Sequence, residues 1–239
     1  MKKTVILSVI CVGLLFVGCQ PRPAQEENQD VKRGVYTPEN TTPMEITSFE
    51  TIQLQTPDYE TGDALLAIAK KRKSDREYQD KNVSLKHLSE ILWMANGVNR
   101  DDGKRTVPSA MALYPLDTYA VLPNGIYLYD PATHALVPKV EGDHRALAGL
   151  QPFVQTAPLN LVFIADYSRY EGDRPVPEDK RLYLAALDAG HCTQNVYMYC
   201  ASEGLKTVVR AGAQEEALLE ALGLDKARYQ FVVAQTVGY

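Results

Sequence analysis

The sequence has few of the residues from which metal centres and disulfide frameworks are built. Its 239 residues include four cysteines, four histidines and one tryptophan. Neither C-x-x-C nor H-E-x-x-H spacing occurs, which argues against a structural zinc site, and we predict no metal. A basic excess is also missing, because the formal net charge is −5. Since nucleic-acid binding needs a positive field, we expect no nucleic acid as partner.

No apolar run is long enough for a typical membrane span. The longest, Val5 to Val17, follows Lys2 and Lys3 and has the length of a signal-peptide core. It ends in Phe16-Val17-Gly18-Cys19, which resembles a bacterial lipobox. We therefore predict a lipoprotein signal peptide at residues 1–18, with a lipid on Cys19 that holds the protein in the cell envelope on the extracytoplasmic side. A simple secretory signal or a single-span anchor is the alternative.

An envelope location permits disulfides, but the remaining cysteines are badly placed for one. Cys11 leaves with the signal peptide and Cys19 carries the lipid, so Cys192 and Cys200 are left. Both fall in a predicted helix, eight positions apart, where a rise of 1.5 Å per residue separates them by about 12 Å. This distance is too long for a bridge, and we expect two buried free thiols.

The rest of the chain is predicted to be a tether and one domain. Residues 19–55 are polar and contain several prolines, as flexible linkers do. Residues 56–239 mix helices and strands without strict βαβ alternation, which indicates an α+β fold. Helices are predicted at 63–73, 85–96, 143–150, 178–203 and 215–222. Strands are predicted at 47–56, 119–123, 126–129, 135–137, 159–165, 207–209 and 229–237.

Three segments carry groups suited to a phosphorylated planar ligand. The first is Lys71-Arg72-Lys73-Ser74-Asp75-Arg76 at the end of a helix. Arginine forks onto phosphate oxygens, lysine adds a point charge, and serine a short hydrogen bond. A solvated basic patch, favoured there by the helix dipole, is the alternative reading.

The second segment runs from Pro108 to Pro115 and contains small residues between its prolines. Such a stretch suits a rigid loop beneath a flat ring, although an ordinary proline-bracketed loop is also possible. Ser109 is not a predicted nucleophile, because no G-x-S-x-G elbow surrounds it. In the third segment, Gly190 interrupts a helix, which suggests close packing, and Ala211-Gly212 offers bare backbone N–H groups after a strand.

In this order the motifs resemble the FMN-dependent nitroreductase superfamily, and more closely its SagB-type (thiazole/oxazole) dehydrogenases. The resemblance covers Tyr59 to Tyr239. It depends on Lys-Arg-Lys-Ser-x-Arg, Leu-x-x-Ile-Leu-Trp-x-Ala-x-Gly, Arg-Thr-x-Pro-Ser-Ala-x-Ala-Leu-Tyr-Pro, Asp-x-Gly-x-x-x-Gln-Asn, Glu-Gly-Leu-Lys-Thr and the closing Val-Gly-Tyr.

The resemblance implies a three-layer α+β fold with a mixed, mostly antiparallel sheet, and a homodimer with FMN at the subunit interface. It implies that the first segment holds the phosphate and ribityl chain, that the second lines the isoalloxazine, and that the third directs N–H groups at the flavin N5/O4 edge. The residues are Lys73, Ser74 and Arg76, then Pro108, Ser109, Ala110 and Ala112, and finally Ala211 and Gly212. Ala112 falls where many nitroreductases carry asparagine, and Met111 replaces an expected glycine.

The implied activity is hydride transfer through flavin N5 to or from a small organic substrate. No catalytic residue is assigned. His191 and Tyr114 are the candidate proton donors, although the pattern favours a core role for His191 and a packing role for Tyr114. Arg210 could steer an anionic substrate or lie at the surface. The alternative function is a non-catalytic flavin- or ligand-binding envelope lipoprotein with a degenerate nitroreductase fold.

Overall fold

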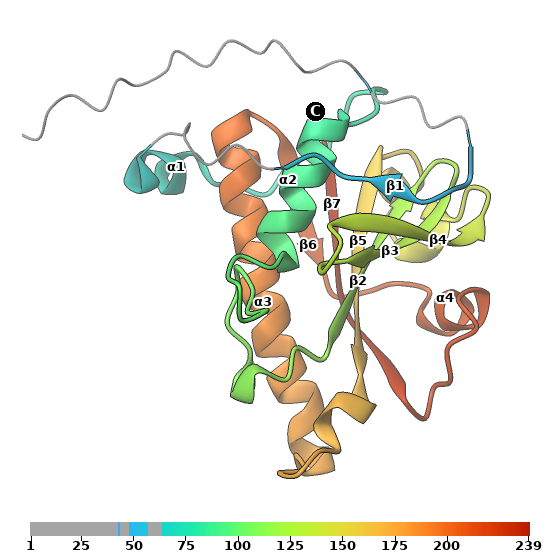
Figure 1. Ribbon diagram of the computed structural model, residues 1–239. Helices are drawn as coiled ribbons and strands as arrows, with labels where there is room; N and C mark the ends of the chain where they lie inside the picture. Colours follow the sequence, from blue (N-terminus) through green and yellow to red (C-terminus); the bar gives the residue numbers. More distant parts are fainter. Residues whose placement is uncertain (1–42, 44–47, 57–63) are drawn as a thin grey trace, which may run out of the picture. The chain divides into compact units, whose positions relative to one another are not determined.

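A seven-stranded antiparallel sheet is the centre of the fold, and helices cover both of its faces (Figure 1). The computed structural model describes residues 43, 48–56 and 64–239. The predicted signal peptide, Cys19 and most of the predicted tether lie outside these residues, so the proposed domain boundaries stay predictions. Within the described ranges, no helix combines the length and the apolarity that crossing a membrane requires.

The strand order in the sheet is β1-β4-β3-β2-β5-β7-β6. All pairings between the described strands are antiparallel, in keeping with the expected mostly antiparallel sheet. The Asn124-Gly125 signal does mark a hairpin, because Leu122 pairs with Gly125. The strands are β1 (Ile52–Gln53), β2 (Leu116–Leu122), β3 (Gly125–Asp130), β4 (Ala135–Glu141), β5 (Leu159–Asp166), β6 (Lys206–Arg210) and β7 (Tyr229–Gly238).

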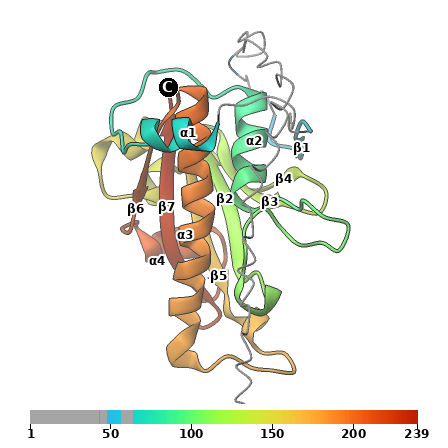
Figure 2. The same cartoon turned by 90° about the vertical axis from the view of Figure 1, so that its left-hand side faces the viewer.

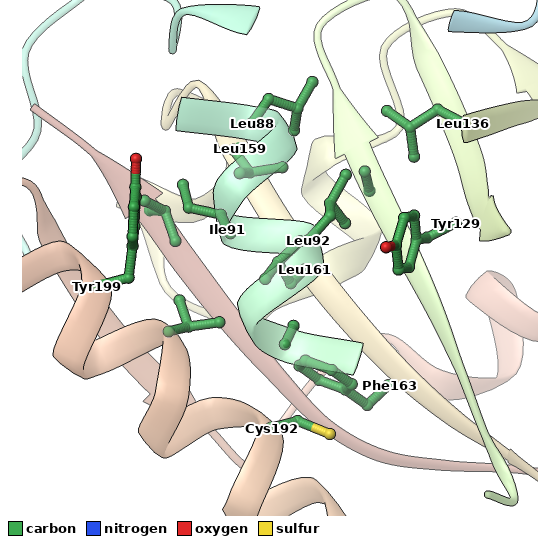
Figure 3. Packing of buried hydrophobic residues seen from close by; sticks show 14 of the residues in the cluster. Leu88, Ile91, Leu92, Tyr129, Leu136, Leu159, Leu161, Phe163, Cys192 and Tyr199 are labelled. Carbon is green, nitrogen blue, oxygen red and sulfur yellow. The ribbon is translucent and has the colours of Figure 1, made fainter. Parts of the chain in front are cut away.

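Every residue of β5 is buried because both faces of the sheet are covered. One face packs against α2 (Leu85–Asn96) and α3 (Glu178–Glu203), with Leu161 and Phe163 pointing into that core (Figure 3). The other face, which includes Val162 and Ile164, packs against α4 (Glu215–Ala221) and the short 3-10 helices η2 (Arg145–Ala148) and η3 (Pro152–Gln155). The fold therefore has three layers, as predicted.

Local signals set the helix ends. Ser84 caps α2, since its hydroxyl accepts a hydrogen bond from the His87 backbone N–H at 3.1 Å. Gly97 ends α2, where a Cβ would lie 2.5 Å from the Trp93 ring. Gly204 ends α3 with φ of 71°, a left-handed conformation that glycine adopts without a steric penalty. The predicted bounds of α3 match the structure.

Three smaller expectations have different outcomes. Cys192 and Cys200 are buried free thiols, as predicted, and burial raises the pKa of the Cys192 thiol to about 12. The close packing expected at Gly190 is absent from the described part of the chain, because a Cβ there would meet no atom within 4 Å. The helix predicted at 143–150 is only the 3-10 turn η2.

Among the remaining elements, α1 (Leu65–Lys71) lies beside α3 (Figure 2), and η1 (Ala110–Ala112) and η4 (Tyr167–Tyr170) are 3-10 turns.

Candidate functional site

The segment that follows α1 is attached to α3 and β6 through the Tyr197 hydroxyl. Ser74 Oγ lies 2.8 Å from this hydroxyl, which also accepts a hydrogen bond from the Val209 backbone N–H at 3.0 Å. The Asp75 backbone N–H donates to the Thr207 carbonyl at 3.0 Å. Because β6 is an edge strand, the segment lies along one border of the sheet.

A pocket of about 250 Å³ opens beside this segment, and three lysines contribute to its lining: Lys71, Lys73 and Lys206. Tyr197 also lines it, and the Arg72 guanidinium lies 5.3 Å from the centre of the Tyr197 ring. Of the predicted phosphate residues only Lys73 lines the pocket, and its ammonium pairs with Asp75 at 3.2 Å. Arg76 is exposed and has no hydrogen-bond or ion-pair partner among the described residues, so its guanidinium is available to an external anion.

The second predicted segment is fixed to α3 by a short hydrogen bond. Ser109 Oγ donates to Asp188 Oδ2 at 2.5 Å and accepts from the Tyr114 backbone N–H at 2.9 Å. Asp188 is only 5% exposed. Burial raises the pKa of this carboxyl, and the hydrogen bond from Ser109 opposes that change. The position of the loop therefore depends on its hydrogen bond to Asp188.

The same loop has an unusual backbone. Met111, Ala112 and Tyr114 have φ of 53°, 54° and 45°, a region that non-glycine residues seldom occupy. Two arginines hold the end of the loop, because Arg169 Nη1 donates to the Tyr114 carbonyl at 2.7 Å and the Arg105 guanidinium lies 4.7 Å from the Tyr114 ring centre. Strained segments that are held by surrounding contacts are frequent at functional sites.

The third segment follows a buried arginine. Arg210 is 5% exposed and donates to the Ala148 carbonyl at 2.6 Å, to Asn160 Oδ1 at 3.1 Å and to Thr236 Oγ1 at 3.0 Å. Burial lowers the pKa of its guanidinium to about 10. Arg210 is therefore structural, which corrects the expectation that it steers a substrate or lies at the surface. It fixes the end of β6, beyond which Ala211 is exposed and Gly212 half-buried.

Helix α3 separates the predicted segments. Ser74 contacts α3 at Tyr197 and Ser109 contacts it at Asp188, nine positions earlier. Nine residues make about two and a half turns, so the two contacts lie on opposite sides of α3 and about 13 Å apart along its axis. Figure 2 shows β6 on one side of α3 and α2 on the other. Lys73 and Asp75 of the first segment line the pocket beside β6, and no residue of the Pro108–Ala112 loop lines that pocket.

Comparison with known proteins identifies the family. A model of the nitroreductase family matches residues 69–239. The chain belongs to this family. A relative from Methanocaldococcus jannaschii, named as a putative nitroreductase, is 36% identical over 187 residues, which are 74% of this chain and 92% of the relative.

Solved structures of nitroreductases share the fold. A crystal structure named as a putative nitroreductase of Ralstonia eutropha has 40% identity and a TM-score of 0.75, covering 83% of this chain and 93% of the other. A structure from Desulfovibrio desulfuricans, named as a putative nitroreductase in complex with FMN, has 22% identity and a TM-score of 0.52, covering 74% of this chain and 87% of the other. At that identity the second likeness shows the fold alone.

The candidate site contains two residues whose contacts the sequence analysis did not predict. Tyr197 and Asp188 hold the two predicted segments from opposite sides of α3, but their roles depend on contacts with residues far away in the sequence. His191 is exposed, which corrects its expected place in the core, whereas Tyr114 is half-buried and packed as predicted. Within the described ranges, no three His, Cys, Asp or Glu side chains gather as metal ligands would.

Proposed function

We propose that this nitroreductase is an FMN-dependent oxidoreductase that acts as a homodimer, with each flavin site built from both copies. The observation that carries the proposal is the separation of the predicted flavin segments by α3. A second copy can supply the Pro108–Ala112 loop to the Ser74 side of the first.

The outer side of α3 suits this partner. Tyr183 and Leu187 are 62% and 45% exposed. Gly190 lies about one turn after Leu187, and a Cβ at Gly190 would meet no atom within 4 Å. These positions recur at helical spacing on the side turned away from the sheet. Monomeric proteins seldom expose such apolar surface, and a glycine within it lets a second helix approach closely.

The residues around the first pocket fit the phosphate end of FMN. Ser74 offers a hydroxyl, Arg76 an unpaired guanidinium, and Lys73 an ammonium, while Lys206 adds a further cation from β6. Phosphate oxygens accept charge-assisted hydrogen bonds from these groups. Because Asp75 pairs with Lys73, we expect Arg76 to make the largest contribution.

The other end of the site fits a flat ring. The exposed Ala211 and the half-buried Gly212 have no bulky side chain that would keep a ring from the backbone N–H groups. Asp188 holds the loop that would line this ring, through its hydrogen bond with Ser109. The loop contains Pro108, Ser109, Ala110 and Ala112. When bound, FMN would carry two electrons and would exchange a hydride with a small organic substrate at N5. The chain positions the ring and keeps water from it.

The branch and the location of the enzyme are part of the proposal. The ordered motifs support the SagB-type branch, and the lipobox-like sequence ending at Cys19 supports a lipid anchor in the cell envelope. NAD(P)H is not expected outside the cytoplasm, so the organic substrate would be the hydride donor and would be oxidised. A membrane quinone would then be the electron acceptor, and the anchor would keep the enzyme close to it. A Cys19→Ala variant should leave the membrane fraction, whereas unchanged fractionation would contradict lipidation.

Flavin content and turnover test the proposed activity. Purified protein should be yellow, and its flavin should be reduced by dithionite and reoxidised by an acceptor. Arg76→Ala should weaken FMN binding by about tenfold or more, because a hydrogen bond to a charged group is lost. Arg174→Ala is the matched control, since Arg174 is exposed and distant in sequence from every predicted flavin residue. Full FMN occupancy in Arg76→Ala would contradict the phosphate assignment, and bound flavin without turnover would favour the non-catalytic alternative.

A further inference from the structure

A second pocket, of about 190 Å³, lies behind the strained loop and contains none of the predicted flavin residues. It is formed where the start of β2 meets the end of β3, and two arginines from outside the sheet, Arg105 and Arg169, complete its lining. The pocket has a lining of its own, although Arg105 and Arg169 also contact Tyr114 at the end of the strained loop.

The two arginines differ in their partners. Arg169 forms an ion pair with Asp117 and donates to the Tyr114 carbonyl at 2.7 Å. Arg105 Nη1 donates to the neutral Asn96 Oδ1 at 2.8 Å, and no carboxylate of a described residue lies within ion-pair distance of Arg105. Burial lowers the pKa of the Arg105 guanidinium, and the positive charge of Arg169 lowers it further. Arg105 is thus a half-buried cation whose charge is not compensated by an ion pair.

The carboxylates that line the pocket are already engaged. Asp117 pairs with Arg169, and Asp130 accepts from the Ala132 backbone N–H at 2.9 Å and from Thr133 Oγ1 at 2.6 Å. Their negative charges nevertheless remain near any ligand. They would repel a dianion such as phosphate more strongly than a monoanion.

Leu116 on β2 and Leu128 on β3 also line the pocket, but they belong to the hydrophobic clusters on opposite faces of the sheet and form no common apolar wall. The ligand class therefore follows from charge, shape and size: one negative charge, a planar pair of oxygens that matches the fork of the guanidinium, and a body small enough for about 190 Å³. From this combination we infer that the pocket is a binding site for a small organic monocarboxylate, whose oxygens accept hydrogen bonds from Arg105.

Calorimetric titration of the purified full-length protein with sodium butyrate, at constant ionic strength, tests this site. We expect saturable binding to one site per chain, and weaker binding of inorganic phosphate. Arg105→Gln should weaken butyrate binding by about tenfold or more, because the charged donor is lost. Arg174→Gln removes an exposed arginine outside the pocket and should bind as the wild type does. Arg76→Ala should also bind butyrate normally, which separates this site from the flavin site.

A second measurement avoids any dependence on the folding of the Arg105 variant. Phenylglyoxal modifies arginine side chains, and peptide mapping of the wild-type protein can follow Arg105 and Arg174 separately. Butyrate should slow modification of Arg105 and leave that of Arg174 unchanged. Absence of saturable butyrate binding, equal affinity in a folded Arg105→Gln variant, or no protection of Arg105 would overturn the inference.

Discussion

The two sides of α3 hold their loops in different ways. On the β6 side, Ser74 is exposed and shares one hydroxyl contact with Tyr197, while Arg76 has no described ion-pair partner. On the α2 side, Ser109 bonds a buried carboxylate, and the loop after it contains three left-handed residues. The segment on the β6 side therefore needs an anionic ligand to balance its positive charge. The loop on the α2 side is fixed before any ligand binds.

Matched serine substitutions give the largest expected difference between the two sides. Ser109→Ala removes the hydrogen bond to the buried Asp188 carboxylate, so we expect a loss of about 2–3 kcal/mol of unfolding free energy. Ser74→Ala removes a contact at an exposed hydroxyl and should cost less than about 1 kcal/mol. Urea unfolding of flavin-free protein measures both, and equal losses would contradict the comparison.

Acid should lower the free energy of unfolding through His87, which joins α2 to α3. His87 is 1% exposed, and burial lowers the pKa of its imidazole from the usual 6.5 to about 4. Its Nδ1 lies 2.8 Å from the Tyr199 hydroxyl, and because this hydroxyl donates to Glu90, Nδ1 is the donor in the His87–Tyr199 hydrogen bond. Between pH 6.5 and 4 the unfolded chain binds more protons than the folded one, and stability falls as the pH falls through this window.

We expect His87 to account for a loss of about 2 kcal/mol between pH 7.5 and 5. Urea unfolding at both pH values measures the change in unfolding free energy. His87→Gln should reduce this pH dependence, because the amide cannot take up the proton. His144→Gln is the control at a less buried histidine and should keep the wild-type dependence. An unchanged pH dependence in His87→Gln would assign the effect to other groups.

Met111→Gly should give the smallest effect, and one of opposite sign. Met111 has φ of 53° and is 49% exposed, so glycine relieves backbone strain with little loss of apolar burial. We expect a stabilisation of about 1 kcal/mol, seen as a higher thermal midpoint. Ala132 is exposed and has no left-handed φ, so Ala132→Gly should destabilise the protein slightly. A lower midpoint for Met111→Gly would show that the side chain stabilises the loop through contacts that outweigh the strain.

The sequence predicted most elements because their signals are local. The serine cap at Ser84, the Asn124-Gly125 turn and the glycine at Gly204 each act through neighbouring residues. It misjudged His191 and Arg210, since burial at these positions depends on which side of α3 or β6 faces another element. Asp188 stands in a recognisable motif, but no local signal gives its contact with Ser109 or that of Tyr197 with Ser74, because these partners lie far away in the chain.

The sequence by itself determined the secondary structure, the family and the residue types that a flavin phosphate needs. Only the tertiary structure decided that Ser74 and Ser109 contact opposite sides of one helix, and that Arg105 lines a pocket without an ion-pair partner among the described residues. The physical reason is that periodicity and caps act over a few residues. The side of a helix on which a distant loop docks is set instead by the packing of the whole core.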